Sequence, residues 1–155
     1  KKQIKNLLIV LISTLALSAC STAKKTGSVG GDVYTGNDTV KFLASGVKDR
    51  VFFATNSSSL TTASRDTLRK QASYMRKNKK LNVVLEGHAD ERGTREYNLA
   101  LGEKRANSAK DYLMTYGISG KRISVISYGK EKPVNPGSTP LAWSQNRRSV
   151  TIKAN

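Results

Sequence analysis

The stretch EGHADERGTREYNLALGEKRA, residues 86–106, decides the fold of this chain because it joins an apolar strand to an amphipathic helix. One face of that helix combines small and aliphatic residues at helical spacing: Leu99, Gly102, Ala106, Ala109 and Leu113. A face of this character is typical of a helix that packs on a sheet. The stretch therefore predicts a strand, a charged loop and a long helix that covers the sheet.

A second face of the same helix carries a different set at helical spacing: Thr94, Asn98, Leu101 and Arg105. Asp90 lies in the loop just before the helix, and a loop that returns over the helix N-terminus brings its carboxylate near Arg105. Such a pair suits a zwitterion, because the carboxylate binds an ammonium and the planar guanidinium binds a carboxylate through two hydrogen bonds. An intramolecular salt bridge explains the same residue types, so both interpretations stay open.

The rest of the chain supplies the other elements of a small sheet protein. Helices are predicted over residues 61–78 and 95–116, and strands over residues 47–53, 81–86, 122–128 and 148–153. Two helices are too few to cover both faces of a sheet. The β-α-β-α-β-β order therefore predicts an α/β (α+β) two-layer sandwich, with both helices on one face of a mixed four-stranded sheet. Residues 129–146 contain all three prolines and predict a long loop with a helical turn around residues 142–146.

The first residues have the pattern of an export signal. Three lysines among the first five residues precede an aliphatic run over residues 7–17, which is shorter than the ~20 apolar residues of a spanning helix. The run ends in Leu-Ser-Ala-Cys, which resembles a bacterial lipobox with Cys20 as the lipidated residue. We predict a lipoprotein signal peptide over residues 1–19, a lipidated N-terminus and flexible tether over residues 20–46, and a folded domain over residues 47–155.

The charge balance is strongly basic, with 27 lysines and arginines against 11 acids and a formal charge of +16. This balance favours anionic partners without choosing among them. Export removes the chain from nucleic acid, and the cations are scattered without a base-stacking platform. With Cys20 lipidated, the single histidine, His88, cannot form the usual zinc site, and no nucleophile motif points to catalysis. We therefore predict no enzyme, no cofactor, no metal and no nucleic-acid partner.

Three motifs carry a resemblance to a known family: GHADERGTREYNLALGEKRA at residues 87–106, ISYGKEKP at 126–133 and NRRSV at 146–150. Together they resemble OmpA-like peptidoglycan-binding domains, most closely the branch of peptidoglycan-associated lipoproteins, over residues 47–153. In that family the loop aspartate and the helix arginine, here Asp90 and Arg105, hold the free amino and carboxylate ends of diaminopimelate in the peptidoglycan stem peptide. The resemblance also places Thr94 and Leu101 in the ligand pocket.

One departure from the family falls just after the first strand. This chain has Thr55 and Asn56 where the family usually has an apolar or aromatic residue followed by aspartate. The family contacts its ligand there partly through backbone amides, which a side-chain change leaves in place. We therefore keep Thr55 and Asn56 in the predicted site, together with Asn98 of the polar helix face. For Arg147 and Arg148, a solvated basic strand end and a position beside the pocket are both open, and we favour solvent for Arg148.

The resemblance implies an outer-membrane lipoprotein, anchored through Cys20 with its domain in the periplasm, that ties the membrane to the cell wall without making or breaking a bond. It further implies the Tol-Pal system, with TolB and other Tol-Pal proteins as partners and roles in envelope integrity and cell division. A lipoprotein scaffold that binds Tol proteins and has a weak or degenerate pocket is the alternative. A third possibility is a basic protein held on anionic polymers by charge alone, whose binding salt weakens steeply.

Overall fold

The structure is a computed structural model that describes residues 29–154, so the predicted signal peptide and the Cys20 lipidation site lie outside the described residues. Its helices are α1 (Thr62–Lys77), α2 (Arg95–Thr115) and α3 (Pro140–Asn146), and its main strands are β5 (Arg50–Phe52), β6 (Asn82–His88), β7 (Ile123–Gly129) and β8 (Arg148–Ala154). Within the described range, no helix combines the length and the apolar character that crossing a membrane requires.

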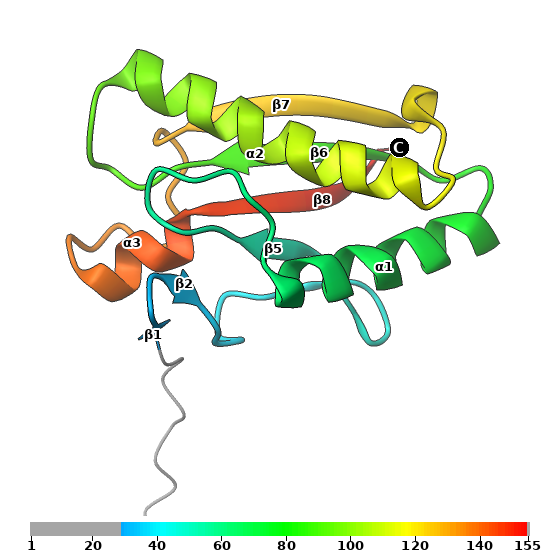
Figure 1. The fold of residues 1–155 in the computed structure, drawn as a ribbon, viewed down its shortest axis with the longest axis horizontal. Coiled ribbons are helices and arrows are strands. Elements are labelled where there is room, and N and C mark those ends of the chain that lie inside the picture. The colour runs from blue at the N-terminus through cyan, green and yellow to red at the C-terminus, as the bar shows by residue number, and fades with distance from the viewer. Residues whose placement is uncertain (1–28, 155) are drawn as a thin grey trace, which may run out of the picture.

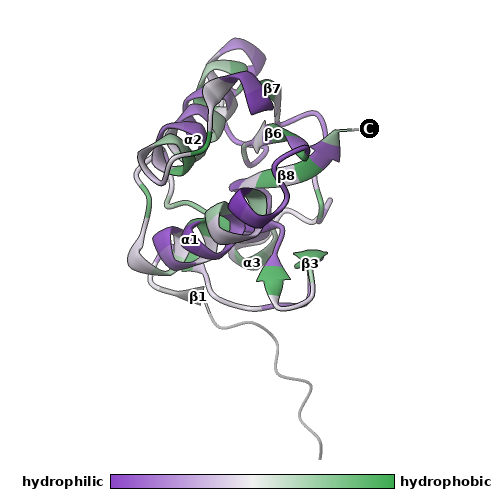
Figure 2. Ribbon diagram, turned by 90° about the vertical axis from the view of Figure 1, so that its right-hand side faces the viewer, coloured by the Kyte–Doolittle hydropathy of each residue, from purple (hydrophilic) through white to green (hydrophobic). Residues whose placement is uncertain are grey.

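The four main strands form one mixed sheet in the order β5-β8-β6-β7. β8 runs antiparallel to both of its neighbours, whereas β6 and β7 run parallel because α2 connects them as a crossover. Figure 1 and Figure 2 show α1 and α2 on the same face of this sheet. The predicted two-layer sandwich is therefore confirmed.

α2 lies directly on β6 where two glycines meet. A Cβ atom added at Gly87 would stand 1.8 Å from the carbonyl oxygen of Gly102, and one added at Gly102 would stand 2.9 Å from the carbonyl oxygen of Gly87. Leu85, Ala106 and Leu113 are almost completely buried in the core between the helices and the sheet. The core face predicted for α2 is thus confirmed, and the close approach holds the N-terminal half of α2 against the end of β6.

The segment before β5 differs from its prediction. We call residues 29–48 the N-terminal arm; it contains two short hairpins, β1 (Val29–Gly30) with β2 (Val33–Tyr34), and β3 (Phe42–Ala44) with β4 (Val47–Lys48). Tyr34 is 2% exposed and packs edge-on against Phe52, with 4.8 Å between the ring centroids, and Leu43 is 5% exposed. The described part of the predicted tether therefore packs on the domain. Isolated anchors such as these produce no apolar period, which is why the sequence favoured a tether.

α3 occupies the end of the predicted long loop and is longer than the helical turn expected there. Pro140 begins the helix, and the Thr139 side chain caps it by accepting a hydrogen bond of 3.1 Å from the backbone N–H of Ala142. Arg147 is the single residue between α3 and β8. α3 therefore fixes the position of Arg147 at the start of the sheet's second strand.

Candidate functional site

An open pocket of about 500 Å³ lies where the loops after β5 and β6 meet the start of α2. Its lining consists of Thr55, Asn56, Asp90, Arg92, Gly93, Thr94 and Tyr97. The structure thus brings together four of the predicted site residues: Thr55, Asn56, Asp90 and Thr94. The other three predicted residues are buried behind the pocket and do not line it, and we call them the rear wall: Asn98, Leu101 and Arg105.

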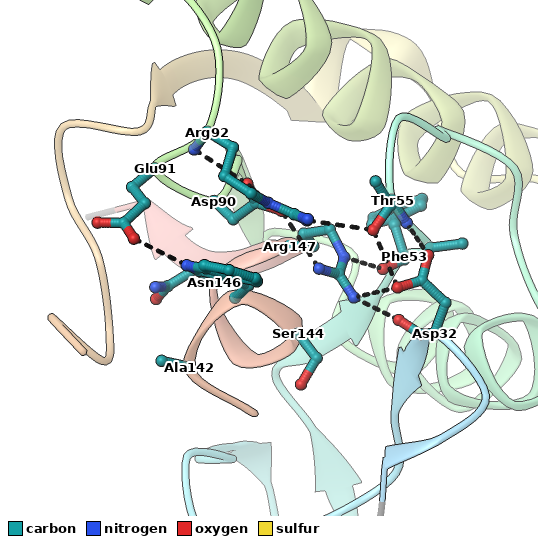
Figure 3. Close-up of polar contacts among 12 residues, drawn as sticks. Asp32, Phe53, Thr55, Asp90, Glu91, Arg92, Ala142, Ser144, Asn146 and Arg147 are labelled. Atoms are coloured by element: carbon teal, nitrogen blue, oxygen red, sulfur yellow. Dashed lines mark hydrogen bonds and ion pairs between the residues drawn. The ribbon is translucent and has the colours of Figure 1, made fainter. Parts of the chain in front are cut away.

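Five polar side chains beside the pocket contact one another in a closed circuit, which we call the charge ring (Figure 3): Asp32, Thr55, Arg92, Asp90 and Arg147. Thr55 Oγ1 donates to Asp32 Oδ1 at 2.9 Å and accepts from Arg92 Nη2 at 3.2 Å. Arg92 Nη2 donates to Asp90 Oδ2 at 2.7 Å. Arg147 closes the circuit, because Nη1 lies 3.2 Å from Asp90 Oδ2 and Nη2 lies 2.9 Å from Asp32 Oδ1. Two carboxylates thus face two guanidinium groups, and the ring is balanced in charge.

Asp90 is 7% exposed and takes both of its ion pairs from this ring. Arg92 donates two side-chain hydrogen bonds to the Asp90 carboxylate, from Nε at 3.0 Å and from Nη2 at 2.7 Å. Its backbone N–H donates a third, at 3.1 Å. Burial raises the pKa of the Asp90 carboxyl, but the bonds from Arg92 and Arg147 outweigh that effect and hold the pKa below its usual value. Asp90 is therefore a carboxylate at neutral pH, and its described ion-pair partners are Arg92 and Arg147 rather than Arg105.

Arg105 is fully buried and donates hydrogen bonds to backbone carbonyls. Its guanidinium donates to the carbonyl oxygens of Ser57 at 2.8 Å, His88 at 2.9 Å and Ala54 at 3.0 Å. These bonds join α2 to the loop after β5 and to the end of β6. Desolvation, and secondarily the charge of Arg147, lower the pKa of Arg105 to about 10, so the group remains charged at neutral pH. In this geometry Arg105 holds the pocket's loops in place.

The other predicted residues of α2 shape the loop that carries Asp90. Thr94 caps the helix by accepting a hydrogen bond of 3.2 Å from the backbone N–H of Tyr97. Asn98 is 2% exposed and donates to the carbonyl oxygen of Arg92 at 2.8 Å. Leu101 is 8% exposed, so it packs behind the pocket instead of lining it. The four residues that spacing placed on one face of α2 do lie together, but three of them, Asn98, Leu101 and Arg105, are buried instead of facing the pocket.

Both arginines of the NRR motif are buried, so the solvated strand end that we favoured for Arg148 is wrong. Arg147 is 2% exposed and, besides its two carboxylates, donates to the carbonyl oxygen of Phe53 at 3.0 Å. Arg148 is 6% exposed and donates to the carbonyl oxygens of Asn146 and Lys132. Desolvation and the nearby charge of Arg50 lower the pKa of Arg148 to about 10. The motif's position directly before a buried strand was the available signal.

Two members of the charge ring, Arg92 and Asp32, were not predicted from the sequence. Arg92 lies over the Trp143 ring, 4.3 Å from its centroid, and Trp143 Nε1 donates to Glu91 at 2.8 Å. These contacts attach the Asp90 loop to α3. Asp32 belongs to the N-terminal arm, and its carboxylate also accepts a short hydrogen bond from the backbone N–H of Thr55. No local pattern pointed to Asp32, because its partners are far away in the sequence.

His88 lies buried beside Glu86, with 3.6 Å between His88 Nε2 and Glu86 Oε2. His88 is 1% exposed, stacks on Tyr128 and has no described hydrogen-bond partner for its ring nitrogens. Desolvation and the nearby cations Arg148, Arg50 and Lys132 lower its pKa to about 3, so the ring is neutral at physiological pH. Across the described residues, no cluster of three or more histidine, cysteine or acidic side chains is placed to hold a metal ion.

A two-layer α/β sandwich with a carboxylate–guanidinium pocket at one end of its sheet defines the class of the protein, and comparisons give the family. Residues 52–147 match the OmpA family. A peptidoglycan-associated lipoprotein of Rhizobium meliloti is 44% identical over 94% of this chain and 85% of its own length, and one of Brucella melitensis is 40% identical over 93% and 89%. The crystal structure of the peptidoglycan-associated lipoprotein from Burkholderia pseudomallei superposes with a TM-score of 0.67 and 36% identity, covering 69% of this chain and 91% of that one.

The chain therefore belongs to the OmpA family, among the peptidoglycan-associated lipoproteins.

Proposed function

We propose that this chain is an outer-membrane lipoprotein that binds peptidoglycan non-covalently and thereby ties the outer membrane to the cell wall. The names of its relatives support binding to peptidoglycan. The observation that carries the proposal is the Asp90 carboxylate at the edge of an open pocket, with the guanidinium groups of Arg92 and Arg147 beside it. This arrangement suits a ligand that carries both an ammonium and a carboxylate.

The ligand that we propose is the diaminopimelate of the stem peptide. Its free ammonium would bind Asp90, in exchange for part of the contact with Arg92, whose side chain is 42% exposed and can turn toward solvent. The carboxylate of the same centre would bind the donors around Thr55 and Arg147, while Arg105 keeps the loop of Thr55 in place. Binding requires no bond to be made or broken, so the site needs no catalytic group.

The membrane and protein partners belong to the same proposal. Cys20 would carry the lipid anchor, and Ser21 after it would direct the protein to the outer membrane with the domain in the periplasm. TolB and other Tol-Pal proteins are the proposed protein partners, with a role in envelope integrity and cell division.

One observation favours a second candidate, a scaffold for Tol proteins with a weak pocket. Both ion-pair positions of Asp90 are already taken by Arg92 and Arg147, so a ligand ammonium has to compete with two guanidinium groups. Hydrogen bonds to charged groups contribute about 1.5–3 kcal/mol each, so losing those from Arg92 and Arg147 would lower the affinity of Asp90 for a ligand ammonium.

Calorimetric titration distinguishes the candidates. The full chain in detergent is titrated with a muropeptide containing meso-diaminopimelate and with the same peptide containing lysine, at low and high salt. We expect saturable binding of the first peptide only, which persists in salt and is lost in Asp90→Asn. Asp111→Asn, at an exposed site near the other end of α2, is the matched control and should bind normally. Binding of neither peptide would favour the scaffold, and equal, salt-sensitive binding of both would indicate charge attraction alone.

A further inference from the structure

The N-terminal arm supplies the pocket with a carboxylate of its own. Asp32 lies between β1 and β2, and its side chain is half exposed. The carboxylate nevertheless accepts three hydrogen bonds from the site: from the backbone N–H of Thr55, from Thr55 Oγ1 at 2.9 Å and from Arg147 Nη2 at 2.9 Å. Arg147 also donates to the backbone carbonyl of Asp32. Figure 3 shows the Asp32 side chain turned toward Thr55 and Arg147.

The charges of the ring show why this position is a carboxylate site. Without Asp32, the ring contains one carboxylate, Asp90, and two guanidinium groups, Arg92 and Arg147. Arg147 is 2% exposed, and a buried excess of positive charge is unfavourable unless an anion compensates it. The donors around Asp32 are a backbone N–H, a hydroxyl and a guanidinium, which together match the acceptor geometry of a carboxylate. A second carboxylate at this position balances the two guanidinium groups, and the arm provides it.

We propose that Asp32 is an internal ligand: the N-terminal arm fills the carboxylate-binding position of the pocket with the Asp32 side chain, so that an external carboxylate binds only after this side chain has turned away. The arm competes as part of the same chain, so its effective concentration is high whatever the protein concentration. The apparent affinity for an external ligand is then reduced in proportion to the fraction of molecules in which the Asp32 side chain is turned away. That the external ligand is the diaminopimelate carboxylate rests on the function proposed above.

The Asp32 carboxylate carries the same charge at neutral pH as the ligand carboxylate with which it would compete. Its slight burial raises its pKa, but the hydrogen bonds from Thr55 and the charges of Arg147 and Arg92 outweigh this and hold the pKa below its usual value. Asp32 is thus fully charged at neutral pH, as a ligand carboxylate is.

The test compares the full chain in detergent with Asp32→Ala and with Asp38→Ala. Asp38 is a matched control because it is also an acid of the N-terminal arm, but its carboxylate accepts from Gln145 at 3.0 Å and does not line the pocket. The probe is acetate, added at neutral pH while the backbone N–H resonance of Thr55 is followed by NMR. Sodium chloride at the same ionic strength separates specific binding from screening.

We expect acetate to shift the Thr55 resonance saturably in Asp32→Ala. The dissociation constant for acetate should be about tenfold lower than in the native chain or in Asp38→Ala, because the charge-assisted contact of Asp32 no longer competes. Equal shifts in all three proteins, or none in Asp32→Ala, would overturn the proposal. The meso-diaminopimelate muropeptide is titrated in parallel and should also bind Asp32→Ala more tightly. If it binds no variant while acetate still separates them, the internal ligand stands and the proposed peptidoglycan function fails.

Discussion

The rear wall and the charge ring lie side by side, and each contains an almost fully buried arginine, but the two arginines contact different groups. Arg105 in the rear wall donates only to backbone carbonyls in its described hydrogen bonds. Arg147 in the charge ring donates to two carboxylates as well as to carbonyls. Carbonyl acceptors are fixed in the backbone and carry no net charge, whereas carboxylates can be protonated, screened or exchanged for others. Arg105 therefore holds the pocket's loops in place, whereas Arg147 balances the carboxylates of the charge ring.

The largest effect is expected from Arg105→Ala. The substitution removes the hydrogen bonds that Arg105 donates to the carbonyl oxygens of Ser57, His88 and Ala54. Ala54 keeps a bond of 3.3 Å from the backbone N–H of Ser57, whereas the buried His88 carbonyl loses its charged donor. We expect a loss of about 3–5 kcal/mol in the free energy of unfolding, measured with urea. Arg95→Ala on the same helix, where the side chain is exposed and pairs with Glu131, should lose less than about 1 kcal/mol. Equal losses would mean that Arg105 does not support the fold.

Gly87→Ala should have the next largest effect, because it separates α2 from β6. The added methyl group would stand 1.8 Å from the backbone carbonyl oxygen of Gly102, so the helix has to move. We expect a loss of about 2–3 kcal/mol in stability together with weaker ligand binding, since the rear wall moves relative to the ring. Gly31→Ala, where an added Cβ meets nothing within 4 Å but φ is +72°, provides a comparison for backbone strain alone. A fully stable Gly87→Ala would contradict the close contact.

Acid should affect His88 and the charge ring in different pH ranges. The folded pKa of His88 is lowered to about 3, so as the pH falls below about 6.5 the unfolded chain takes up a proton that the folded chain does not. Stability should therefore fall from about pH 6.5 downward, by at most about 1.4 kcal/mol per pH unit. Urea unfolding at a series of pH values measures this loss. His88→Gln should remove most of it above about pH 4.5.

The charge ring contributes at lower pH. The folded pKa values of Asp32 and Asp90 are lowered, so their contribution is fully present above about pH 4 and is lost as the pH falls below it. Asp90→Asn should therefore flatten the stability curve only in that lower range. A change in the slope of that curve near pH 6 would show that the charge ring is coupled to His88.

The smallest effect is expected from Asp32→Ala on stability. The Asp32 side chain is half exposed and Arg147 keeps its bond to Asp90, so the loss should be about 1 kcal/mol or less. Denaturant unfolding of the full chain measures it. A much larger loss would mean that Asp32 is a structural part of the domain, and would weaken its interpretation as a displaceable internal ligand.

Much of the fold and part of the pocket could be predicted from local patterns. The spacing of Ala106, Ala109 and Leu113 predicted which face of α2 packs on the sheet, and the structure confirms it. Thr94 was predicted as a site residue from the spacing of one helix face, Asp90 from its loop before that helix, and both from the resemblance to the family; both line the pocket. These predictions depend on periodicity and on chain connectivity, which extend over a few residues only.

The partners of the charged groups depended on the tertiary structure. Long arginine side chains reach several acceptors, so spacing alone does not decide whether Asp90 pairs with Arg105, Arg92 or Arg147. That choice is made where four connecting segments meet, between residues up to 115 positions apart in the sequence. Asp32 is the extreme case, because one acid in a segment without apolar period has no sequence signal. The sequence by itself therefore determined the sandwich and the position of the pocket, whereas the tertiary structure alone decided which carboxylate fills it, because ion pairing follows distance in space.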